Sequence, residues 1–116
     1  MAMPVYSDYL VRTRVVELLA KASAAREAVW DKYAADGFSS FGAGYSSIYD
    51  FGSATANFAA GSIGDSYPII TIMGTDATHE TYLILTPTAT SSGTLVWECS
   101  TDDPLRKRYL PVNCRG

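Results

Sequence analysis

One segment carries the strongest structural signal in the chain: residues 4–37, PVYSDYLVRTRVVELLAKASAAREAVWDKYAADG. Apolar or small side chains recur in it every three or four residues, which is the period that keeps one face of a helix toward a core. The residues on this face are Val11, Val15, Leu18, Ala22, Ala25, Val29 and Tyr33. Pro4 suits a first helical turn, and Asp36-Gly37 suits a helix end because glycine adopts the left-handed conformation without strain. The segment therefore predicts one helix over residues 4–36.

The length of this helix matters as much as its pattern. At a rise of 1.5 Å per residue it is about 45 Å long, more than a 116-residue domain needs, so we expect one end to project. Glu17 precedes Lys21 by four residues, which predicts an ion pair on the helix surface. Val16 and Leu19 lie off the core face, and they either widen the apolar stripe or contact a partner; the sequence leaves both readings open.

The rest of the chain divides into a loop-like and a strand-like part. Residues 37–65 are rich in Gly, Ser and Ala without a clear period, and predict a long surface loop with a short helix near residues 54–60. Aromatic residues spread through this loop are expected to pin it to the body by burying their rings. They are Phe38, Phe41, Tyr45, Tyr49, Phe51 and Phe58.

The strand-like part covers residues 66–99. Three runs rich in β-branched and aromatic residues, 67–73, 81–86 and 94–99, are separated by turn residues, and Pro87 is expected to stop the second run. Short connections favour antiparallel pairing. Tyr109-Leu110 would add a short fourth strand. Since the long helix is the only large cover for this sheet, we predict an α+β fold over residues 1–116: one helix on a three- to four-stranded antiparallel meander.

Composition narrows the possible functions. The net charge of -3 disfavours a generic basic nucleic-acid binder, and there is no run of 18 apolar residues to span a bilayer. A single histidine, His79, makes a zinc site implausible, and the aspartates lack the spacing of an EF-hand. Neither a GxSxG nucleophile motif nor a strand-linked glycine-rich phosphate loop is present. We expect no catalytic site, no metal and no cofactor.

The two cysteines, Cys99 and Cys114, both lie in the last eighteen residues. Their even number favours a disulfide, and the alternative is a pair of unpaired core thiols. A bridge would place the protein in an oxidising compartment.

Both ends of the chain carry recognisable motifs. MPVYSDY at residues 3–9, followed by RTRV at residues 12–15, resembles the segment that follows the hydrophobic stem of type IV pilins. WEC at residues 97–99 and RYLPVNCR at residues 108–115 resemble the C-terminal element of the same family. The resemblance implies the pilin fold, with residues 37–65 as the variable αβ-loop. It also implies a disulfide between Cys99 and Cys114 that bounds a loop over residues 99–114.

The resemblance further implies a function. Such a protein is a structural subunit of a type IV pilus filament that serves adhesion, twitching motility and DNA uptake, and it is not an enzyme. The family's hydrophobic stem is absent from this sequence, so we expect a soluble fragment of a longer subunit. Full-length subunits would assemble as a helical homo-oligomer through that stem. Implied partners are the pilus assembly machinery and prepilin peptidase. The implied location is the extracellular filament, preceded by an inner-membrane-anchored form with a periplasmic domain.

Two sets of residues are candidate contact sites. Met3, Tyr6 and Leu10 share one face of the projecting helix end and are expected to contact neighbouring subunits. Three adjacent basic residues lie inside the C-terminal loop: Arg106, Lys107 and Arg108. They form either a solvated turn or a patch that attracts DNA or an anionic host or abiotic surface, with weak, salt-sensitive affinity that many copies would strengthen.

Two alternative identities follow from these features. One is a minor pilin that binds DNA or a surface through the basic loop. The other is a type II secretion pseudopilin, which the C-terminal disulfide disfavours.

The cysteine pair generates a stability prediction. Trp97 lies two residues before Cys99, so a bridge at Cys99 would be tied to the core. Reduction should lower the melting temperature and release the chain from about residue 100, because closing a loop of this length is worth about 3 kcal/mol. Limited proteolysis with and without reductant checks this, and identical cleavage in both samples would contradict it.

Overall fold

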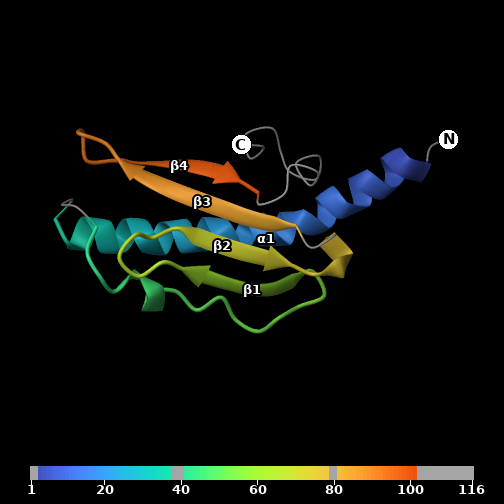
Figure 1. Ribbon diagram of the computed structural model, residues 1–116, viewed down its shortest axis with the longest axis horizontal. Helices are drawn as coiled ribbons and strands as arrows, with labels where there is room; N and C mark the ends of the chain where they lie inside the picture. Colours follow the sequence, from blue (N-terminus) through green and yellow to red (C-terminus); the bar gives the residue numbers. More distant parts are fainter. Residues whose placement is uncertain (1–2, 38–40, 79–80, 102–116) are drawn as a thin grey trace.

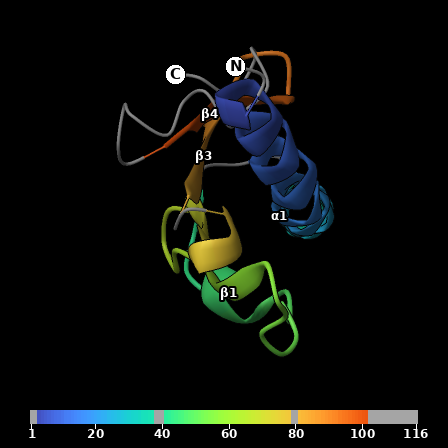
Figure 2. The ribbon, with the colours of Figure 1, turned by 90° about the vertical axis from the view of Figure 1, so that its right-hand side faces the viewer.

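A computed structural model of the chain describes residues 3–37, 41–78 and 81–101, with side chains described from Leu10 onward in the N-terminal helix. The helix α1 spans Met3–Ala35, and two 3-10 turns, η1 and η2, span Tyr45–Ser47 and Asp76–Thr78. The strands are β1 (Phe58–Ile63), β2 (Ile70–Gly74), β3 (Tyr82–Ala89) and β4 (Leu95–Ser100). They pair antiparallel in the order β1-β2-β3-β4, and α1 covers one face of this sheet (Figures 1 and 2). The predicted α+β architecture is confirmed.

The core lies between the predicted stripe of α1 and one face of the sheet. All seven stripe residues are buried, with exposed fractions of 0–3%. Opposite them, Ile70 pairs with Leu85 and Ile72 with Leu83 across β2 and β3, and these four side chains are also buried. Residues two apart in a strand share a face, so the two central strands present a continuous apolar surface to the helix. The helix ends at Ala35, one residue before the predicted end, and Gly37 in the following turn has a φ of 85°, the left-handed conformation predicted for it.

The first strand was not predicted from the sequence. The expected short helix near residues 54–60 is wrong, because Phe58–Ile63 forms β1, and the sheet begins at residue 58 rather than 66. A shift in register between Phe58 and Ala60 interrupts the alternation of buried and exposed positions. Small residues fill the middle of the strand, FAAGSI, so neither period nor β-propensity marks it in the sequence.

Pro87 is the second correction. It does not stop a strand, since β3 continues to Ala89 and Pro87 pairs with Trp97 of β4. The carbonyl oxygen of Pro87 accepts a hydrogen bond of 2.6 Å from the Tyr67 hydroxyl, which belongs to the segment before β2. The pairing of β3 with β2 ends at Leu85, so Pro87 has no β2 partner. In an antiparallel pair, the N–H and C=O of one residue point to the same side of the strand, and the Pro87 carbonyl points toward Tyr67. The missing N–H of Pro87 therefore faces away from β4 and removes no bond between β3 and β4. The expected strand at Tyr109-Leu110 lies outside the described residues.

Side chains of α1 hold the αβ-loop. The predicted ion pair of Glu17 with Lys21 is not among the ion pairs of the described residues. Instead, the Glu17 carboxylate accepts hydrogen bonds from the Thr55 hydroxyl and, at 3.3 Å, from the Asn57 amide. The Lys21 ammonium donates to the Phe51 carbonyl at 2.5 Å and lies 4.6 Å from the centre of the Phe58 ring. Both charged side chains therefore bind residues that lie 30 to 40 positions later in the sequence. The spacing of residues within a helix does not predict such contacts.

A second set of hydrogen bonds joins the αβ-loop to Asp65, two residues after β1. One oxygen of its carboxylate accepts hydrogen bonds from the Ser46 hydroxyl at 2.7 Å and from the backbone N–H groups of Gly44 at 3.1 Å and Ser46 at 3.5 Å. These bonds, that from the hydroxyl first, lower the pKa of Asp65 because they favour its ionised form. The hydrogen bonds to Asp65 fix η1, whose Tyr45 is 1% exposed and packs in the core.

Gly74 at the end of β2 should not tolerate a side chain. An added Cβ would lie 2.0 Å from the Thr78 hydroxyl oxygen and 2.9 Å from the Thr81 carbonyl oxygen, and both threonines are buried. We expect Gly74→Ala to lower the free energy of unfolding by about 1–3 kcal/mol, as overpacking generally does. Urea denaturation measures it. The control is Gly42→Ala, where a Cβ meets nothing within 4 Å, and equal midpoints for the two variants would contradict the prediction.

The lowered pKa of Asp65 predicts a dependence on pH. The stabilisation is fully present above the pKa of an unfolded aspartate, about 3.9, and is lost as the pH falls through the lower folded value. Asp65→Asn should therefore melt below the unchanged protein at pH 7, and the difference should shrink toward zero under acid conditions. A difference in melting temperature that stays constant from pH 7 to acid would show that the carboxylate charge contributes nothing.

Candidate functional site

The N-terminal turns of α1 extend past the sheet, as predicted (Figure 1). The helix has 33 residues, about 50 Å at 1.5 Å per residue, and the longest dimension of the molecule is 55 Å. Of the predicted subunit contacts, Leu10 is half-buried, and Met3 and Tyr6 lie in the helix with side chains outside the described set. Their role in contacts between subunits remains a prediction.

Val16 and Leu19 have different environments. Leu19 is half-buried and packs against the core, so it widens the apolar stripe. Val16 is 58% exposed and does not. Val16, Ser23 and Trp30 are spaced seven residues apart, which places them on one side of the helix. Since Ser23 and Trp30 line a groove shared with β4, this side of α1 faces β4. We call it the β4-side flank, defined by these three residues.

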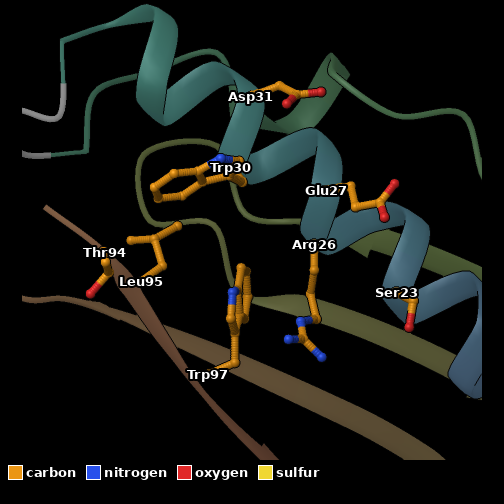
Figure 3. Close-up of a pocket in the computed structure, with 8 residues that line it drawn as sticks. All are labelled: Ser23, Arg26, Glu27, Trp30, Asp31, Thr94, Leu95 and Trp97. Carbon is orange, nitrogen blue, oxygen red and sulfur yellow. The ribbon is translucent and has the colours of Figure 1, made fainter.

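The groove lies between the C-terminal half of α1 and β4 (Figure 3). Its volume is about 500 Å³. The lining residues are Ser23, Arg26, Glu27, Trp30, Asp31, Thr94, Leu95 and Trp97. Because β4 ends the strand order, the groove runs along an edge of the sheet as far as the described residues show.

Two tryptophans dominate the groove. Trp30 and Trp97 are the two tryptophans of the whole chain, one from the helix and one from the strand. Trp97 is half-buried against the core, and the central carbon of the Arg26 guanidinium lies 5.8 Å from the centre of its ring. Trp30 is 38% exposed, and its ring lies 6.2 Å from that of Tyr33. Figure 3 shows Arg26 beside Trp97 in the gap between helix and strand, with Trp30 above Leu95.

The charges at the groove come from the helix. Arg26 contributes one positive charge, and Glu27 and Asp31 contribute two negative charges, so these three residues together carry -1. Ser23 and Thr94 add hydroxyl groups, each able to donate and accept a hydrogen bond. The groove therefore combines aromatic surfaces with both donors and acceptors.

The groove was not predicted from the sequence, in which Trp30 is one residue of a helix and Trp97 precedes the expected disulfide at Cys99 on a strand. The available signal was that Arg26 and Trp30 are one turn apart on the helix, off the core stripe. Their meeting with β4 depends on the helix crossing the sheet there, which local patterns do not specify.

The structure describes only one of the C-terminal residues for which a role was predicted. Cys99 is half-buried in β4 and packs against the core. Cys114 and the basic residues Arg106, Lys107 and Arg108 lie outside the described residues. The disulfide and the basic patch both remain predictions.

Among residues 3–37, 41–78 and 81–101, no group of three or more His, Cys, Asp or Glu side chains is placed to hold a metal ion. No helix among them has the length and apolar character needed to cross a membrane.

The model of the pilin family, which forms bacterial filaments, matches residues 11–115, nearly the whole chain. No solved structure matches the chain.

Proposed function

The chain belongs to the pilin family of bacterial filament proteins, and from this membership we propose that its α1 helix packs against sister copies through Val16 and its N-terminal turns. The family consists of structural, non-enzymatic proteins, which supports a role for this chain as a subunit of an extracellular pilus filament. Subunits of such a filament must contact one another, so the question is which surface of this subunit does so.

The observation that carries the proposal is the one-sided cover of α1. The sheet buries the core stripe to 0–3% exposure, whereas Val16 on the β4-side flank keeps 58% of its surface exposed. The N-terminal turns of α1 extend beyond the sheet (Figure 1). The predicted contacts Met3 and Tyr6 belong to these turns, and Leu10 follows them, half-buried. A helix that its own domain covers on one side only can bury its other side against a second molecule, and each Å² of apolar surface removed from water contributes about 25 cal/mol.

We further propose that the filament serves adhesion, twitching motility and DNA uptake. The basic residues Arg106, Lys107 and Arg108 would supply the weak contacts to DNA or to an anionic surface, multiplied along the fibre. Before assembly, the proposed subunit is anchored in the inner membrane with its domain in the periplasm. It is then processed by prepilin peptidase and handled by the pilus assembly machinery, with the Cys99–Cys114 bridge formed there.

The subunit contact is testable at Val16. Val16→Asp should abolish or strongly reduce filament formation, because a charge buried without a partner in a subunit contact is costly. The fold of the domain should be unaffected, since the side chain is largely exposed. Filaments sheared from cells are compared with total cellular pilin, and the melting temperature of the purified domain reports the fold.

Val16→Ile is the matched control, because it keeps an apolar side chain at the same place, and it should assemble normally. Filament yields from Val16→Asp equal to those of the control would show that Val16 is not a subunit contact.

A further inference from the structure

The groove between α1 and β4 has the size and composition of a small-molecule site. Its volume of about 500 Å³ falls within the range of about 300–1,000 Å³ that is usual for ligand pockets. Such pockets combine aromatic surface with a few polar groups that fix orientation.

The aromatic part of the groove suits a ring with an apolar face. An indole ring offers a broad flat surface and one N–H donor, and it loses little conformational entropy on binding. Trp97 is held in place by the core on one side and by Arg26 at 5.8 Å, and Trp30 is 38% exposed on the opposite wall. The two walls belong to different elements, so a ligand between them contacts both α1 and β4 (Figure 3).

The polar part suits a ligand that is rich in hydroxyl groups and carries no net charge. Arg26 donates hydrogen bonds, Glu27 and Asp31 accept them, and the hydroxyls of Ser23 and Thr94 do both. With a summed charge of -1, these groups disfavour phosphate, sulfate or nucleic acid. A pyranose ring has an apolar C–H face and a rim of hydroxyls that both donate and accept. We propose that this groove binds a neutral saccharide, with a hexopyranose unit between Trp30 and Trp97.

A segment of a second copy of the chain fits less well. Of the eight lining residues, five are polar or charged: Ser23, Arg26, Glu27, Asp31 and Thr94. A peptide would need a matching polar group for each of them. The saccharide proposal concerns the single domain and stands or falls separately from the subunit contact proposed above.

The test uses the intrinsic fluorescence of the chain. Both tryptophans line the groove, so the whole tryptophan signal reports its occupancy. The chain is titrated with cellohexaose and maltohexaose, which represent extracellular polysaccharides, and with chitohexaose, which represents amino-sugar glycans. At least one of them should give a saturable change with a dissociation constant of about 0.1–1 mM, and a sulfated heparin hexasaccharide should give none.

Three variants keep both tryptophans and locate the binding. Arg26→Ala should weaken binding about tenfold because it removes a hydrogen-bond donor to the ligand. Asp31→Asn should also weaken binding, because it replaces a charged acceptor by a weaker neutral one. The control is Glu98→Gln, next to Trp97 but exposed in β4 and absent from the groove lining; it should bind as the unchanged chain does.

Four results would overturn the proposal. They are no saturable change with any neutral oligosaccharide, unchanged binding in both Arg26→Ala and Asp31→Asn, binding of the sulfated sugar alone, and a fluorescence change that follows chain concentration without sugar. The last would identify a second copy of the chain as the occupant.

Discussion

The packing of one apolar stripe of α1 on the two central strands is the contact on which the other features depend. Buried residues on the helix meet Ile70, Ile72, Leu83 and Leu85 of β2 and β3. A helix of 33 residues held along one line has a fixed rotation about its axis. That rotation directs Lys21 toward the αβ-loop, and it places Trp30 beside β4. It also determines which flank the sheet leaves uncovered.

Polar contacts then fix the αβ-loop, which packing of the core alone does not hold in place. The αβ-loop has few long apolar runs, yet Glu17 and Lys21 of the helix bind its backbone and side chains, and Asp65 binds Ser46. Aromatic rings complete the attachment, since the centre of the Phe41 ring lies 5.4 Å from that of Tyr33 and 5.8 Å from that of Tyr45. The loop is therefore attached to the same helix that the proposed function uses for subunit contact. A disturbance of α1 should reach both.

How far the sequence predicts this molecule differs between its elements. The helix stripe was predictable residue by residue, from Val11 to Tyr33, because a period of 3.6 residues over about six turns has few competing explanations. β1 was not, because a register shift and small residues erase the alternation. The prediction that Pro87 stops the strand was wrong because a proline breaks strand pairing only where its missing N–H would face a neighbouring strand. The groove could not be predicted because Trp30 and Trp97 are brought together only by tertiary packing, which local sequence patterns do not specify.

The central claim is that Val16 and the N-terminal turns of α1, which the sheet leaves exposed, form the surface between subunits. The most direct measurement is a cryo-electron microscopy map of the assembled filament at side-chain resolution. The account predicts that Val16 lies within van der Waals contact of a neighbouring subunit, with the N-terminal turns of α1 enclosed by sister copies. A map in which Val16 and those turns face solvent along the whole fibre would contradict it.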